Sequence, residues 1–191
     1  NMKPEELAEV DKKQVVAQIF MTKADAEQEQ ENVGLGTPES RAGECVTIFA
    51  GQRIQELLKE RKSFDEAREQ VEIELMEKAN DPDFVLTKEW VKSGLNVLDY
   101  INDTIEIDNI EHFAWDTDHG NTLVDAKGHG TSADMFVKTK DGDTLGISLK
   151  KDFKVFIVNG GYGKAMKEFE SKLGLTLPEN CQAKEYNKLR K

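Results

Sequence analysis

The chain has 191 residues, of which 38% are hydrophobic and 33% carry a charge, and its formal net charge is -11. This length is typical of one domain with its own hydrophobic core, and the acidic balance argues against a protein that coats DNA by charge alone. No apolar run approaches the roughly 20 residues of a membrane-spanning helix, so we expect no membrane partner.

The N-terminal residues 1–36 are predicted to form an arm or linker. A helix over 5–22 places apolar side chains that need the main body, or a partner subunit, for burial. These side chains are Val15, Val16, Ile19 and Phe20. The arm could therefore support a homo-oligomer. Residues 25–31 are polar and acidic, and we expect them to form the linker.

Residues 37–191 are predicted to form a single α/β domain, helical over 37–104 and with a sheet over 105–191. Thr37 as N-cap and Pro38 at the first helical position predict a helix start. Three helices are expected, over 37–61, 63–79 and 87–102, with a break at Asn80-Asp-Pro82-Asp. Short apolar stretches rich in β-branched residues then predict strands over 111–115, 131–139, 144–150 and 154–158, followed by a helix over 163–173.

Two of the expected strands carry an acid and a lysine. Side chains alternate faces along a strand, so the loop length decides whether Asp134 and Lys150 meet. A two-residue turn on Asp141-Gly142 sets Asp134 opposite Leu149 and separates the polar side chains. A three-residue loop over 140–142, with Gly142 left-handed, sets Asp134 opposite Ser148 on the face of Lys150. We predict the three-residue loop.

Asp134, a hairpin and a strand reading Ile-Ser-Leu-Lys150 together resemble the PD-(D/E)XK nuclease superfamily. The resemblance covers about 60 residues clearly and another 25 weakly. It implies a restriction-endonuclease-like core (helix, mixed central β-sheet, helix) with a helical insertion before the sheet, and it favours a phage-type source. The family more often has Glu or Asp at the position of Ser148. The Ser-Leu-Lys of this chain resembles the corresponding tripeptide of some phage and restriction-type members.

The resemblance also implies a divalent metal held by Asp134, by an acid on the first helix and by the backbone carbonyl of Leu149. Glu44 is the candidate acid, because it shares a helix face with Ile48 and Gly51 and an inward carboxylate needs a partner. Gly43 and Gly51 would let another backbone or strand come close. Alternatively, Glu44 pairs with Arg41 or lies partly exposed.

Oxygen ligands of this kind suit Mg²⁺ or Mn²⁺ better than Zn²⁺. Lys150 would supply positive charge beside the attacking water or the phosphate, and Ser148 could position a metal-bound water. The structural alternative is that Asp134 caps a strand and Lys150 lies on the surface. Two histidines, His119 and His129, lie near Asp134 in the sequence and could supply a supporting ligand or a general base. Their spacing fits no standard metal motif, and a hydrogen-bonded polar loop is expected there.

Residues 150–191 hold ten basic and five acidic side chains, a net charge of +5, which leaves -16 for residues 1–149. DNA would therefore approach the C-terminal side. A glycine turn into a helix can hold a phosphate with its backbone amides, and an aromatic ring can stack on a base or sugar. The candidate DNA contacts are Lys151, Asn159, Gly160, Tyr162 and Lys164.

The two cysteines, Cys45 and Cys181, match no zinc-binding or CxxC spacing. We expect reduced thiols in a cytoplasmic protein, in the host cytoplasm if it is phage-encoded. The leading functional hypothesis is a metal-dependent deoxyribonuclease. The alternatives are a catalytically inactive nucleic-acid-binding or assembly protein on the same fold, or an acidic protein-interaction module.

Overall fold

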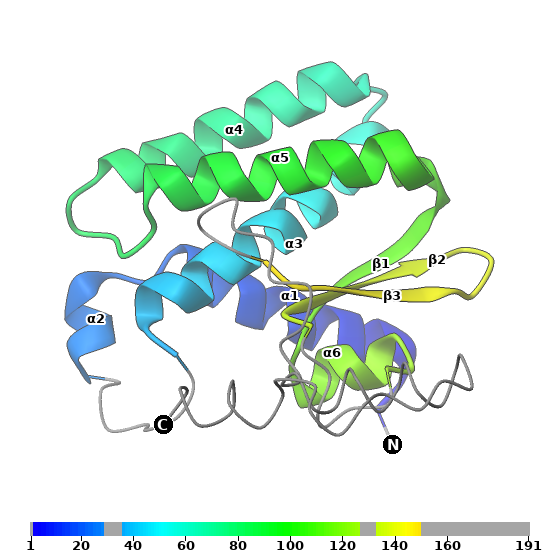
Figure 1. Ribbon diagram of the computed structural model, residues 1–191, viewed down its shortest axis with the longest axis horizontal. Helices are drawn as coiled ribbons and strands as arrows, with labels where there is room; N and C mark the ends of the chain where they lie inside the picture. Colours follow the sequence, from blue (N-terminus) through cyan, green and yellow to red (C-terminus); the bar gives the residue numbers. More distant parts are fainter. Residues whose placement is uncertain (1, 29–35, 127–132, 150–191) are drawn as a thin grey trace, which may run out of the picture. The chain divides into compact units, whose positions relative to one another are not determined.

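Six helices and a small antiparallel sheet make up the part of the chain that the computed structural model describes, residues 2–28, 36–126 and 133–149 (Figure 1). This part is mixed α/β, as predicted. The helices are α1 (Pro4–Ile19), α2 (Lys23–Gln28), α3 (Pro38–Lys59), α4 (Phe64–Asn80), α5 (Lys88–Ile105) and α6 (Asp118–Leu123). A 3₁₀ turn (Ile107–Asn109) precedes the strands β1 (Ile110–Trp115), β2 (Met135–Thr139) and β3 (Thr144–Ile147), which lie in the order β1-β2-β3.

The long helices begin where the capping residues predict. The Thr37 hydroxyl accepts a hydrogen bond from the Ser40 N–H at 3.2 Å, ahead of Pro38 in the first turn of α3. At the start of α4, Ser63 Oγ accepts from the Glu66 N–H at 3.3 Å and the Glu66 carboxylate accepts from the Ser63 N–H at 2.9 Å. This reciprocal pair satisfies two of the N–H groups that a helix start leaves without partners. Both predicted helix starts are confirmed.

Two short helices differ from the sequence prediction. Part of the expected acidic linker forms α2, where the Thr22 hydroxyl accepts from the Asp25 N–H at 3.1 Å and Ala26 is buried. The expected polar loop around His119 instead contains α6, whose first turn is capped by Thr117 accepting from the Gly120 N–H at 3.1 Å. Each helix has six residues, too few for an apolar periodicity to be visible in the sequence.

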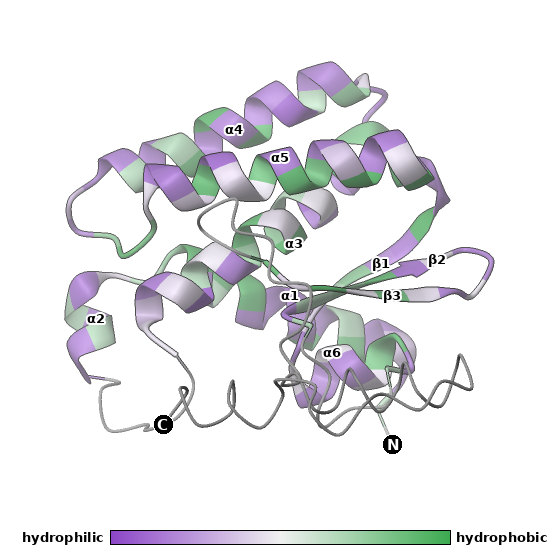
Figure 2. Cartoon of the chain, viewed as in Figure 1, coloured by the Kyte–Doolittle hydropathy of each residue, from purple (hydrophilic) through white to green (hydrophobic). Residues whose placement is uncertain are grey.

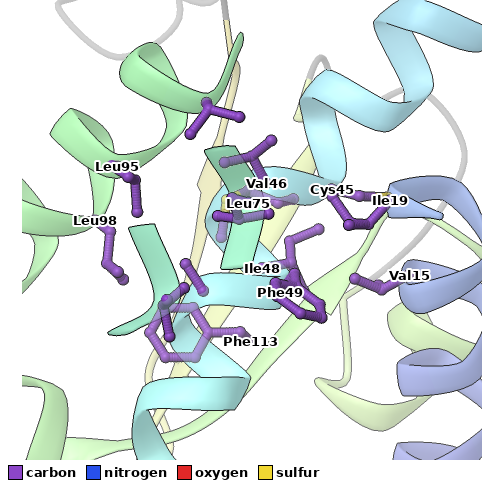
Figure 3. Close-up of a cluster of buried hydrophobic side chains, with 14 of the residues drawn as sticks. Val15, Ile19, Cys45, Val46, Ile48, Phe49, Leu75, Leu95, Leu98 and Phe113 are labelled. Carbon is purple, nitrogen blue, oxygen red and sulfur yellow. The ribbon is translucent and has the colours of Figure 1, made fainter. Parts of the chain in front are cut away.

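Helix α3 is the centre of the core and contacts α1, α4, α5 and β1. Figure 3 shows side chains from these elements gathered around it, including the buried Leu95, Leu98 and Phe113. The two α3 glycines permit this packing. A Cβ at Gly43 would lie 2.0 Å from the Trp90 ring, and one at Gly51 would lie 2.7 Å from the Phe113 ring. The close approach predicted at these glycines is therefore made by aromatic side chains.

Helices α4 and α5 lie side by side over α3 (Figure 1). The Arg68 guanidinium joins them by donating to both carboxylate oxygens of Asp99, at 2.9 and 3.0 Å. Figure 2 shows α4 as largely hydrophilic, in keeping with its outer position. Among the helices of the described ranges, none combines the length and the apolar character needed to cross a membrane.

The sheet has apolar side chains on both faces. Phe113, Met135 and Val137 belong to the main core around α3, whereas Ala114 and Phe136 pack with α6 in a smaller cluster. This alternation is the one expected when both faces of a sheet are covered by helices.

Helix α1 packs alongside β1 and contributes to both clusters. Leu7 and Ala8 pack against the smaller cluster, while Val15 and Ile19 are fully buried in the main core. Between these positions lies Asp11, which is 0% exposed and accepts a hydrogen bond from the Trp115 N–H of β1 at 3.2 Å. Of the two ways of burying Val15 and Ile19, packing on the main body is the one present in this structure.

Candidate functional site

The β2–β3 hairpin has the predicted three-residue loop. Met135 lies opposite Ile147 and Lys138 opposite Thr144, so the next position outward sets Asp134 opposite Ser148. The Thr139 N–H donates to the Asp143 carbonyl at 2.8 Å, which closes the loop over 140–142. Gly142 has a φ of +94°, the left-handed conformation expected of it. The prediction that Asp134 faces Ser148 rather than Leu149 is confirmed.

This register brings three of the predicted site residues into contact. Asp134 Oδ2 accepts a hydrogen bond from Ser148 Oγ at 2.9 Å and another from the Leu149 N–H at 2.6 Å. Asp134 is partly buried and Ser148 is exposed, whereas the Leu149 side chain is only 5% exposed and lies in the main core. The carboxylate is thus held at the open end of the hairpin, against a backbone segment that the core anchors.

Gly142 offers a direct test of the hairpin. A Cβ at this position would meet nothing within 4 Å, so a Gly142→Ala variant changes only the backbone preference. We expect a loss of about 1 kcal/mol in the free energy of unfolding, because an L-residue pays that cost in the left-handed region. Urea unfolding measures it, with Asp141→Ala as a control in the same exposed loop. Equal losses in the two variants would contradict a special role for the Gly142 conformation.

Glu44 lies on α3, half-buried between the buried Gly43 and Cys45. Burial raises the pKa of the Cys45 thiol well above its ordinary value, and the negative charge of Glu44 adds to the shift. Cys45 is a free, protonated thiol, which agrees with the prediction for this cysteine. Glu44 is thus less buried than its neighbours on α3, closer to the alternative in which it lies partly exposed, and its role as a metal ligand stays a prediction.

The remaining predicted site residues lie outside the described residues. They are Lys150, Lys151, Asn159, Gly160, Tyr162, Lys164 and His129, together with the strand over 154–158 and the helix over 163–173. His119 lies on α6 and is half-buried. His112 lies on β1, where burial lowers its pKa; the opposing effect of Glu111 is smaller, and Lys138 lowers the pKa further.

Within residues 2–28, 36–126 and 133–149, no group of three or more His, Cys, Asp or Glu side chains is placed to hold a metal ion. A cation at Asp134 would therefore draw on at most two such side chains from this part of the chain. The oxygen chemistry at Asp134 and Ser148 does fit Mg²⁺ or Mn²⁺, since Mg²⁺ commonly uses one or two carboxylates and keeps several waters.

Comparisons of the chain with protein-family models, with curated proteins and with solved structures give no significant match. The candidate site therefore rests on the hairpin geometry and on the sequence motif.

The sequence reasoning did not identify Asp11, the most deeply buried acid in the described part of the chain. A signal was present, because Asp11, Val15 and Ile19 are spaced by four residues and share one face of α1. Asp11 accepts from the Trp115 N–H and from Gln52 Nε2, the latter at 3.3 Å. Burial raises the pKa of Asp11 to about 6, although both hydrogen bonds lower it. These contacts make Asp11 a structural acid that joins α1, α3 and β1.

Proposed function

We propose that the chain is a metal-dependent deoxyribonuclease that hydrolyses DNA phosphodiester bonds on a restriction-endonuclease-like core. The observation that carries the proposal is the hairpin contact in which Ser148 Oγ and the Leu149 N–H hold the Asp134 carboxylate. This contact keeps Asp134 beside the backbone segment that leads directly into Lys150. Lys150 is the next residue after Leu149 in the sequence, and the proposal has the acid and the lysine of the motif act together.

Asp134, Glu44 and the Leu149 carbonyl are the groups that would hold Mg²⁺ or Mn²⁺. The Leu149 side chain shares the main core with Ala42 and Cys45, which lie close to Glu44 on α3. The proposed role of Glu44 requires its carboxylate to reach the same cation as Asp134 and the Leu149 carbonyl. A bound divalent cation would neutralise the phosphate and acidify a water molecule.

The chain's own residues have separate tasks in this proposal. Asp134 and Glu44 provide negative charge for the cation, and Lys150 provides positive charge beside the scissile phosphate. The segment 150–191 has a net positive charge and attracts the DNA backbone. Its candidate DNA contacts are Lys151, Asn159, Gly160, Tyr162 and Lys164. The acidic residues 1–149 repel it, which directs DNA toward the C-terminal side.

DNA cleavage in the presence of Mg²⁺ or Mn²⁺ tests the proposal. We expect Asp134→Asn and Lys150→Ala each to lower the cleavage rate by about 100-fold, because the first removes a charge that holds the cation and the second removes a charge that stabilises the transition state. Asp116→Asn is a matched control, since Asp116 is an exposed acid near the same end of the sheet. Equal background cleavage by the wild type and the site variants would refute catalysis. Salt-sensitive DNA binding without cleavage would then favour the inactive nucleic-acid-binding alternative.

A further inference from the structure

Neighbouring backbone groups fix the main chain of Asp134 on both sides. Its N–H donates to the Ile147 carbonyl at 2.9 Å, and its carbonyl accepts from the Asp116 N–H at 3.2 Å. The first contact comes from the β3 side of the sheet and the second from the β1 side. The position of Asp134 is therefore set by the sheet, and the two donors from residues 148 and 149 orient its carboxylate.

These two donors differ in kind. The Leu149 N–H is a backbone group, and the Leu149 side chain, which is 5% exposed, anchors it in the core. The Ser148 hydroxyl is an exposed side-chain donor that reaches the same oxygen, Asp134 Oδ2, at 2.9 Å. An ionised carboxylate oxygen can accept two hydrogen bonds, and both donors reach the same oxygen. Ser148 thus adds a second restraint on the orientation of the Asp134 carboxylate.

The charge at position 148 decides how the site behaves without a cation. A carboxylate here would lie within about a hydrogen-bond length of Asp134 Oδ2, and two like charges at that distance repel. A hydroxyl at this position donates a hydrogen bond to the carboxylate instead. Asp134 and Ser148 can consequently be in contact before any cation binds. The site then has one negative charge fewer than a site with two carboxylates.

We propose that Ser148 is a positioning residue that orients the Asp134 carboxylate for a divalent cation. The inference rests on the metal site of the proposed function, and it differs from the sequence hypothesis, in which Ser148 positions a metal-bound water. Position 148 lacks the carboxylate charge that the family more often has there, and its hydroxyl instead holds Asp134 in one orientation. Any side chain that carries a hydroxyl at the same place should therefore serve.

Mn²⁺ binding to the full chain tests this inference, measured by titration calorimetry without DNA. Ser148→Ala should weaken Mn²⁺ binding by about tenfold, as expected when a partner that orients a metal ligand is removed. Ser148→Thr keeps the hydroxyl and should bind within about twofold of the wild type. Ser148→Asp should bind Mn²⁺ more tightly than the wild type, while its melting temperature in a chelator should fall below that of Ser148→Ala.

Asp134→Asn should abolish the Mn²⁺ binding and thereby assign it to this site. Melting temperatures in a chelator show whether each variant is folded, and Ser148→Thr keeps the test decisive if Ser148→Ala does not fold. Wild-type affinity in Ser148→Ala, loss of affinity in Ser148→Thr, or unchanged binding in Asp134→Asn would each overturn the inference. If the variants show the expected Mn²⁺ affinities but the wild type does not cleave DNA, the proposed function is wrong and the role of Ser148 is supported. If the wild type cleaves DNA but Ser148→Ala binds Mn²⁺ with unaltered affinity, the proposed function is supported and the role of Ser148 is wrong.

Discussion

Replacing Phe113 by alanine should lower the free energy of unfolding by about 3–5 kcal/mol, the range found when a buried aromatic ring is removed from a packed core. Phe113 is 1% exposed and lies on β1, where it packs into the main core against α3 (Figure 3). Its ring also fills the space beside Gly51, which has no side chain to move into the gap. Urea unfolding of the two proteins measures the difference.

The contact with Gly51 makes this prediction sharper. A Cβ at position 51 would lie 2.7 Å from three Phe113 ring atoms, so Gly51→Ala alone should destabilise the protein by about 1–3 kcal/mol. In the Phe113→Ala background that clash is absent, and alanine has a higher helix propensity than glycine by about 1 kcal/mol. Gly51→Ala should then be neutral or stabilising. A double-mutant cycle measures this change of sign.

Phe20→Ala is the matched control for the loss of a ring. Phe20 is 40% exposed, although it contacts the Phe49 ring edge-on and lies 5.2 Å from the Lys78 ammonium. Its removal should cost far less than that of Phe113, because the site stays open to water and little apolar area is lost. Equal losses for the two variants, or additive effects of Phe113→Ala and Gly51→Ala, would contradict this account of the core.

The elements that could be predicted are those governed by local chemistry. Thr37 and Ser63 are side-chain acceptors at helix starts, and Pro82 prevents a helix from continuing. The hairpin register followed from parity, because only an odd loop sets Asp134 opposite Ser148. In each case a few adjacent residues determine the local structure, and contacts with distant parts of the chain have little influence on it.

The contacts that could not be predicted depend on distant segments. The Leu149 N–H that holds Asp134 is a backbone group, and every non-proline residue carries one, so the sequence does not mark it. Gln52 and Gln55 donate to the Phe113 and Ile110 carbonyls of β1, at 3.0 and 2.8 Å, where the outer edge of the sheet meets α3. An edge strand needs such partners, but only the packed structure shows which side chains supply them.

The pH dependence of stability should carry a contribution from Asp11. Burial raises the pKa of Asp11 to about 6, above the ordinary value of 3.8, because its carboxylate is 0% exposed, and the hydrogen bonds from Trp115 and Gln52 lower the pKa by less than burial raises it. A raised folded-state pKa means that the native protein binds the proton more tightly than the unfolded chain does. The stabilisation is complete below about pH 4 and is lost as the pH rises through 6, a change on the order of 3 kcal/mol.

A difference measurement isolates this contribution, since other acids act in the opposite direction. Hydrogen bonds from Ser63 lower the pKa of Glu66, for example, so its stabilising effect is lost as the pH falls. Asp11→Asn has nearly the same shape but does not titrate. Relative to the wild type, it should therefore gain about 3 kcal/mol in unfolding free energy between pH 4 and pH 7. Asp103→Asn, at an exposed position of α5, is the matched control.

The new amide at position 11 faces the Gln52 Nε2 donor, and the Gln52 Oε1 atom is already buried without a partner among the described residues. Asp11→Asn is therefore expected to carry an unfavourable offset from a poorly paired amide. That offset is the same at every pH, because neither amide titrates in this range, so it shifts the difference curve without changing its slope. A difference curve that stays flat from pH 4 to pH 7 would contradict the raised pKa of Asp11. The hydrogen bonds from Trp115 and Gln52 would then balance the cost of burying the charge.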